Sequence, residues 1–99
     1  MIDVTKVAGF DWDGGNVRKN DKHGVSMAEA EQVFFNEPLL MIADLVHSQR
    51  ESRYHALGKT DGGRTLHITF TLRDAGEKIR VISARDMHRK ERTIYEHAT

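Results

Sequence analysis

The chain has 99 residues, in which 15 lysines and arginines balance 15 aspartates and glutamates, and 38% of the residues are hydrophobic. This length suits one domain with a single core, and the sequence has no run of about 18 apolar residues that could cross a membrane. The absence of cysteine excludes disulfides, thiolate metal sites and cysteine catalysis. The N-terminus lacks the basic start and apolar stretch of a signal peptide, so we expect a cytoplasmic protein.

The neutral total conceals an uneven distribution of charge. Residues 73–92 contain seven basic and four acidic residues, a net charge of +3, and residues 18–22 add +2. Residues 27–51 carry a net charge of −4. Clusters of one sign can steer a polyanion even when the total is zero, because screening acts over about 8–10 Å. A solvated charged surface is the alternative interpretation of each cluster.

The N-terminal half predicts a strand followed by helical segments. Residues 9–13 are typical of a short strand, and residues 14–24 of a polar turn or short helix that ends at Gly24. Ser26 and Glu29 have the spacing of a capping box, in which each side chain satisfies a backbone N–H of the other residue. A helix should follow and stop before Pro38. Its apolar stripe contains Met27, Ala30, Val33 and Phe34.

The C-terminal half predicts an antiparallel meander and a last helix. The run 39–43 is typical of a buried strand, and residues 53–58, 65–73 and 79–85 are expected to form three more. The Asp-Gly and Gly-Gly pairs in 59–64 indicate a hairpin. From Asp86 onward, a helical stripe contains Met87, Glu91, Ile94, Tyr95 and Ala98. This order predicts an α+β fold with the helices packed on one face of an antiparallel sheet.

The strand 65–73 alternates cleanly, which leaves threonines, His67 and Arg73 on the face opposite the core. Arg80 and Arg85 on the next strand have opposite parity, so both reach that face only if a bulge intervenes. Arg73 and one of these arginines could then bind a phosphate through two guanidinium groups. The alternative is an exposed strand with ion pairs to neighbouring carboxylates.

Six histidines invite the interpretation of a metal site, but they form no H-x-x-x-H pair and no carboxylate lies at a metal-ligand spacing. A general acid or base is a better interpretation, because histidine changes charge near neutral pH. Each single histidine can also be structural or solvated. Trp12, Tyr54 and Tyr95 are candidates for stacking on bases, although Trp12 could equally anchor the core.

Several motifs in order resemble one known family. They are FDWDGGN, KN and KHGVS, then EAEQVFFNEPLL and HSQRESRYHALGKT, then FTLR and IRVISARDMHRKERTIYE. Together they span about residues 10–96 and are similar to the BrnT family of type II toxins. The resemblance implies a ribonuclease with a RelE-like α+β fold, held inactive by a BrnA-type antitoxin.

The resemblance also implies the chemistry. The ribose 2′-hydroxyl attacks its own phosphate without metal or other cofactor, so the enzyme must position that hydroxyl and stabilise charge on the phosphorus oxygens. The matching positions predict Arg73, Arg80, Arg85, His23 and Lys22 as catalytic residues. The arginines would bind phosphate and stabilise transition-state charge, and the His23–Lys22 pair would transfer protons or position the RNA. Substrate-binding residues are predicted to be Tyr54, Trp12, Arg89 and Arg92. Asp13, Glu91 and Tyr95 also match, and a structural role is open for Glu91, paired with a sheet arginine, and for Tyr95.

Two other functions remain open from the sequence. One is a nucleic-acid-binding module or co-repressor without catalysis, which would bind RNA or DNA but leave RNA intact. The other is a protein-interaction domain that binds a partner through apolar residues around Met87, Ile94 and Tyr95. For the toxin, we expect contact with DNA only through the antitoxin complex, and an acidic or amphipathic antitoxin segment against Arg80–Arg92.

Overall fold

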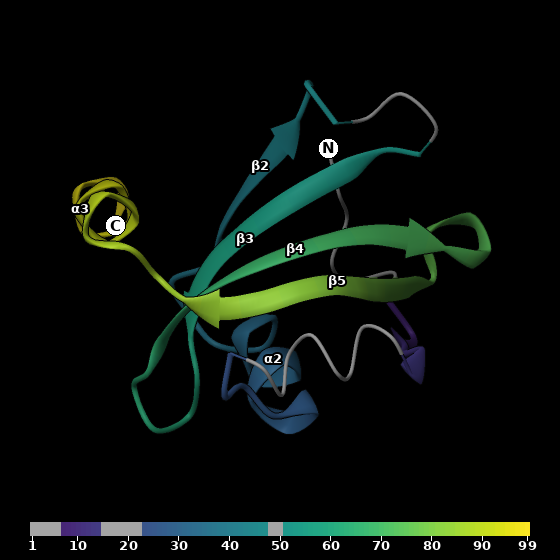
Figure 1. Ribbon diagram of the computed structural model, residues 1–99, viewed down its shortest axis with the longest axis horizontal. Helices are drawn as coiled ribbons and strands as arrows, with labels where there is room; N and C mark the ends of the chain where they lie inside the picture. Colours follow the sequence, from purple (N-terminus) through teal and green to yellow (C-terminus); the bar gives the residue numbers. More distant parts are fainter. Residues whose placement is uncertain (1–6, 15–22, 48–50) are drawn as a thin grey trace.

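The computed structural model describes residues 7–14, 23–47 and 51–99. Among them the strands and helices, in chain order, are β1 (Gly9–Asp11), α2 (Met27–Val33), β2 (Leu40–Asp44), β3 (Arg53–Lys59), β4 (Thr65–Arg73), the 3₁₀ turn η2 (Asp74–Gly76), β5 (Lys78–Asp86) and α3 (Arg89–Ala98). The strands form one sheet in the order β1-β5-β4-β3-β2 (Figure 1). The predicted α+β class is therefore confirmed. No helix in these ranges is long and apolar enough to span a membrane.

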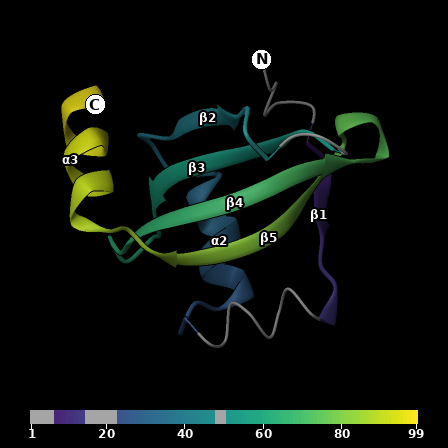
Figure 2. The same cartoon turned by 45° about the horizontal axis from the view of Figure 1, so that its top comes forward.

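The sheet is mixed, whereas the sequence predicted an antiparallel one. β2, β3, β4 and β5 pair antiparallel, as the hairpin signals indicated. β1 pairs parallel with β5, through Gly9 opposite Lys78 and Asp11 opposite Arg80. The N-terminal strand thus lies along the outer edge of β5 (Figure 2). This pairing brings Asp11 close to Arg80 although the two are far apart in the sequence.

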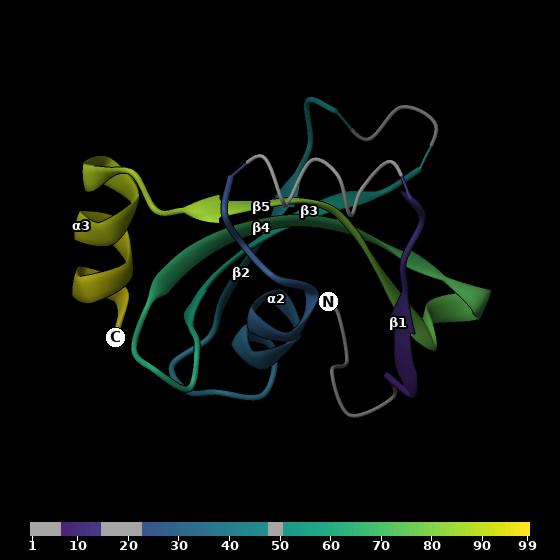
Figure 3. The ribbon, with the colours of Figure 1, turned by 60° about the horizontal axis from the view of Figure 1, so that its bottom comes forward.

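α2 packs under the sheet and forms the main core with it (Figure 3). The predicted capping box is present: the Glu29 N–H donates to Ser26 Oγ and the Ser26 N–H to Glu29 Oε1, both at 3.1 Å. The helix ends at Val33, well before Pro38. Three of the four stripe residues are buried, but Met27, the first residue of α2, is 40% exposed.

The alternation of β4 is borne out, since Leu66, Ile68 and Phe70 are fully buried on the side of α2. β5 carries a β-bulge opposite the Thr69–Phe70 step, where Thr69 pairs with Ser83 and Phe70 with Val81, so Ile82 is the extra residue. A bulge shifts the side-chain parity of one strand. Because of the bulge, the apolar side chains of β5 face the core both before and after Ile82.

A strand is present close to the predicted run 39–43, but β2 is an edge strand, so the prediction that it is buried is wrong. Ile42 is 47% exposed and Ala43 is also exposed. The strand is hydrogen-bonded to β3 on one side and has no partner strand among the described residues on the other. A short apolar run does not reveal whether a strand lies in the middle or at the edge of a sheet.

α3 lies at one end of the sheet and packs against different residues from α2 (Figures 1 and 3). Met87 and Tyr95 are buried against Leu57 and Leu40, and the Tyr95 hydroxyl donates to the Pro38 carbonyl at 2.5 Å. Leu57 is the Cα partner of His67, on the face away from the main core. The prediction that all helices pack on one face is therefore not confirmed for α3.

Candidate active site

The face of the sheet away from α2 carries the three arginines that were predicted as catalytic residues. Direct partners in an antiparallel pair lie on the same face, and the register pairs Arg85 with His67 and Arg80 with Thr71. The bulge at Ile82 therefore places both arginines on one side, as the sequence allowed only with a bulge. We call this side the arginine face; it carries Arg53, His55, His67, Arg73, Arg80 and Arg85.

Arg73 and Arg80 are diagonal neighbours on β4 and β5, which puts their Cβ atoms roughly 7–8 Å apart. Arg80 donates to Asp11 Oδ2 from Nε at 3.2 Å and from Nη2 at 3.0 Å. Arg73 Nη2 lies 3.0 Å from Glu51 Oε2, and its buried Nε has no hydrogen-bond partner among the described residues. Both guanidinium groups are about one-third exposed, so an anion can reach them.

Arg85 on β5 pairs with His67, which lies six residues from Arg73 along β4. Arg85 and Arg73 are therefore roughly 20 Å apart and do not bind the same phosphate. Arg85 makes two hydrogen bonds of 2.8 Å to Glu91, the first-turn carboxylate of α3. These bonds, rather than any other interaction, are the main cause that lowers the pKa of Glu91 to about 2. The structure thus contains the ion pair between Glu91 and a sheet arginine that the alternative of a structural Glu91 requires.

Two histidine rings stack next to this ion pair. The His55 and His67 rings are 4.8 Å apart between centroids and 27° from parallel. Burial and then the nearby Arg85 charge lower the pKa of His67 to about 4, so its imidazole is neutral at pH 7. Its Nδ1 is buried without a hydrogen-bond partner among the described residues.

Asp44 at the end of β2 binds two further imidazole nitrogens. Its Oδ2 lies 2.9 Å from His55 Nε2 and 3.0 Å from His47 Nδ1. Oδ1 accepts the backbone N–H groups of Val46 and His47, each at 3.1 Å. The His47 backbone N–H is the largest cause that lowers the pKa of Asp44 to about 2. Asp44 is the direct partner of Arg53, so this cluster adjoins the arginine face.

The sequence analysis did not select Asp44, His47 or His55 as a group. The pairing of β2 with β3 brings His55 to Asp44, and no sequence spacing reveals that pairing. The Asp44–His47 contact had a detectable signal, however. An Asp followed by turn residues often accepts backbone N–H groups two and three positions later, which would have placed His47 beside its carboxylate.

Trp12 and Tyr54 lie on the side of α2, away from the arginine face. Trp12 Nε1 donates to Glu31 Oε2 at 2.8 Å, and the indole packs against the main core. Tyr54 stacks on Phe70 with ring centroids 5.5 Å apart. Both side chains therefore support the fold directly, and the sheet separates them from the arginines.

The remaining predicted residues are exposed or fall outside the described part of the chain. Lys22 falls outside the described residues, whereas His23 is exposed in the turn before α2, next to Gly24, whose carbonyl accepts Arg64 Nη1 at 2.8 Å. Arg89 and Arg92 are exposed on α3. The structure thus brings Arg73 and Arg80 together with Arg53, and places Arg85 apart from them at the end of the sheet where α3 begins.

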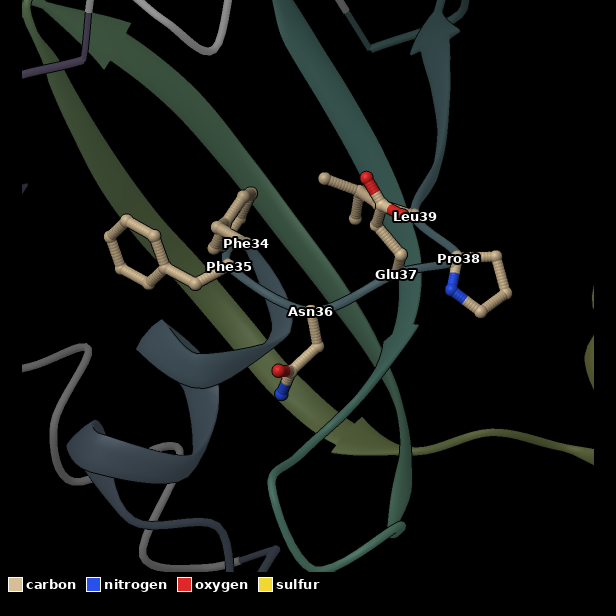
Figure 4. Close-up of a pocket in the computed structure, with 6 residues that line it drawn as sticks. All are labelled: Phe34, Phe35, Asn36, Glu37, Pro38 and Leu39. Atoms are coloured by element: carbon tan, nitrogen blue, oxygen red, sulfur yellow. The ribbon is translucent and has the colours of Figure 1, made fainter.

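An open hollow on the molecule lies between the end of α2 and β2. Its volume is about 640 Å³, and residues 34–39 line it (Figure 4). Asn36 Nδ2 donates to Lys59 O and Asp61 Oδ1, at 3.0 and 2.9 Å, so this amide is used to fix the β3–β4 turn. Phe34 belongs to the main core. The hollow holds no acid–base pair and no cation, and it is not the candidate active site.

Within the described ranges, no group of three or more histidine, aspartate or glutamate side chains could hold a metal ion. The arginine face carries guanidinium, imidazole, carboxylate and hydroxyl groups. Such groups can bind phosphate, transfer protons and stabilise negative charge on an oxygen.

Comparisons with known proteins identify one family and one solved structure with a similar fold. A family model described as "Ribonuclease toxin, BrnT, of type II toxin-antitoxin system" matches residues 12–91. The crystal structure of the Brucella abortus ribonuclease toxin BrnT is similar to the chain, with a TM-score of 0.60 and 21% sequence identity. The match covers 82% of this chain and 97% of the Brucella chain. At this identity the structural likeness concerns the fold, and among curated proteins none matches significantly.

Proposed function

The chain belongs to the BrnT family of ribonuclease toxins of type II toxin–antitoxin systems, and we propose that it cleaves RNA without a metal ion through attack of the ribose 2′-hydroxyl. The BrnT family assignment implies an antitoxin partner and RNA as the target. That the fold is of the RelE type and that the antitoxin is of the BrnA type stay predictions.

The observation that supports this proposal most directly is the register of the β4–β5 hairpin. It pairs Arg80 with Thr71, so Arg80 lies on the same face as Arg73 and Arg53, in a cluster whose diagonal spacing suits one or two phosphate groups. Cleavage by the 2′-hydroxyl proceeds through a phosphorane with extra negative charge on its oxygens. Guanidinium groups that are already aligned stabilise this charge.

The carboxylates that now bind the arginines do not prevent RNA binding. Ion pairs at this exposure stabilise a protein by only about 0–1 kcal/mol, and a phosphate can displace or share them. Asp11 and Glu51 hold Arg80 and Arg73 in defined rotamers in the free protein. We therefore assign phosphate binding to Arg73 and Arg80, and attachment of α3 to Arg85.

The antitoxin should cover the basic end of the chain. Arg89, Lys90 and Arg92 are exposed on α3 beside the end of the arginine face. An acidic or amphipathic antitoxin segment over Arg80–Arg92 would mask both surfaces. The alternative of a partner bound at Met87, Ile94 and Tyr95 is less suitable, because Met87 and Tyr95 are buried within the fold and only Ile94 is available.

The test is cleavage of labelled RNA in excess EDTA by the partner-free protein, beside Arg73→Ala, Arg80→Ala and Arg85→Ala. We expect discrete products from the wild-type protein and a loss of about 100-fold or more for Arg73→Ala and Arg80→Ala. Cleavage that EDTA abolishes would overturn the metal-free mechanism. RNA binding without cleavage would support the nucleic-acid-binding module instead.

A further inference from the structure

The Asp44–His47–His55 cluster adjoins the arginine face, and the proposed function gives it no role. In this cluster a hydrogen-bonded carboxylate, an exposed imidazole and a nearby arginine come together. His47 has 68% of its side chain exposed, whereas Asp44 has only 10%. The accessible His47 imidazole thus forms a hydrogen bond with the nearly buried Asp44 carboxylate.

Asp44 fixes both the position and the tautomer of His47. Each of its oxygens is engaged, Oδ1 by two backbone N–H groups and Oδ2 by two imidazole nitrogens. An ionised carboxylate only accepts hydrogen bonds, so His47 Nδ1 carries the proton. Nε2 of the neutral ring then holds the lone pair and is the nitrogen left to act on a substrate.

His55 has a different position from His47. Its Nε2 faces Asp44 and its Nδ1 lies 3.1 Å from Thr69 Oγ1, so both ring nitrogens are engaged. Its ring also stacks on His67. His55 therefore positions Asp44 from the sheet side, and only His47 presents a nitrogen to solvent.

The cluster lies close enough to the phosphate-binding arginines to act on the same ribose phosphate. Asp44 pairs directly with Arg53, and Arg73 is the diagonal neighbour of Arg53 on the next strand. The backbones of Asp44 and Arg73 are thus two strand spacings apart across the sheet and two residues apart along it, which gives roughly 12 Å. Histidine and arginine side chains that extend from the same face bridge this separation.

We infer that His47 is the general base of the proposed RNA cleavage, with Asp44 and His55 as positioning residues; this inference rests on the proposed function. His47 Nε2 takes the proton of the 2′-hydroxyl, and the 2′-oxygen forms a bond to phosphorus. The bond from phosphorus to the 5′-oxygen breaks, and that oxygen takes a proton from water. The products are a 2′,3′-cyclic phosphate and a 5′-hydroxyl end. The arginines stabilise the charge on the non-bridging oxygens.

The experiment compares single-turnover cleavage and RNA affinity of the wild-type chain with His47→Ala and His47→Gln, in excess EDTA. His97→Ala, at the exposed end of α3, is the matched control. A general base contributes about 10²- to 10⁴-fold, so both His47 variants should cleave at least about 100-fold more slowly. Their RNA affinity and melting temperature should stay unchanged. Glutamine can still donate to Asp44 but cannot accept the proton.

Added imidazole separates a chemical role from a structural one. Free imidazole should restore part of the activity of His47→Ala, where the ring has left a space, and none of the activity of His47→Gln. Near-wild-type cleavage by both variants while Arg73→Ala is inactive would overturn the inference and keep the ribonuclease. Slow cleavage that imidazole leaves unchanged would also overturn it, in favour of a structural His47. An inactive wild-type protein would instead contradict the proposed function itself.

Discussion

Arg85 at the end of β5 and Glu91 in the first turn of α3 form a two-pronged ion pair, with both nitrogen–oxygen distances at 2.8 Å. Glu91 also accepts the His88 backbone N–H at 2.8 Å. The same carboxylate therefore binds an arginine of the sheet and caps the N-terminus of α3. The side chains of both residues are about one-quarter exposed. This pair fixes α3 beside the arginine face.

Glu91→Gln should lower the free energy of unfolding by about 1–3 kcal/mol, because it weakens hydrogen bonds to a charged group and leaves Arg85 without its counter-ion. The pKa of Glu91 is lowered to about 2 in the folded protein, chiefly by Arg85. Its stabilisation is therefore complete above about pH 4.5 and is lost as the pH falls toward 2. Urea denaturation from pH 6 to pH 2 should show a smaller decrease for Glu91→Gln than for wild type. Parallel curves would contradict this role of the ion pair.

Gly58→Ala should destabilise the protein by about 1–3 kcal/mol through overpacking. A Cβ atom at Gly58 would lie 2.8 Å from Val33 Cγ1 and 3.4 Å from the Val33 carbonyl, where α2 crosses β3. Gly62→Ala is the control, because the nearest atom to its Cβ would be Thr60 Oγ1 at 3.9 Å. Chemical denaturation should separate the two variants, and equal stability would show that α2 moves away at little cost.

The His67 imidazole should stay neutral at pH values well below the usual pKa of histidine. Its pKa of about 4 results first from burial and then from the Arg85 charge. The unfolded chain binds this proton near pH 6.5, so the contribution of His67 makes the free energy of unfolding fall as the pH is lowered from about 6.5 to about 4. Nitrogen chemical shifts of the His67 ring in an NMR titration measure this directly. A midpoint near 6.5 would contradict the buried neutral ring.

Regular segments of this fold could be predicted from the sequence. The alternation in residues 65–73 gives both bounds of β4 and its buried side, and Ser26 with Glu29 gives the start of α2. Such patterns reflect local periodicity and capping, which depend on neighbouring residues only. β2 was misjudged because five apolar residues do not reveal what lies beyond the strand.

The candidate site depended on features that single residues do not encode. The sequence showed that Arg80 and Arg85 share a face only with a bulge, but nothing in it located Ile82 as the extra residue. The Asp44–His55 contact depends on the register between β2 and β3, which tertiary packing decides. Residue type therefore predicted which arginines to consider, and strand pairing determined which of them lie together.

Arg80→Ala should weaken RNA binding and make it less dependent on salt. Each phosphate contact on a single strand contributes about 0.7 to the slope of log affinity against log salt concentration, so the slope should fall by about that amount. Arg80→Lys is the matched control, because lysine keeps the charge but cannot bind a phosphate through a planar fork. It should preserve the slope, and its cleavage rate should still fall if two-pronged binding is needed in the transition state. Fluorescence anisotropy of labelled RNA at several salt concentrations gives the slopes. An unchanged slope in Arg80→Ala would mean that Arg80 remains paired with Asp11 when RNA is bound, and that the phosphate is held by Arg73 and Arg53 instead.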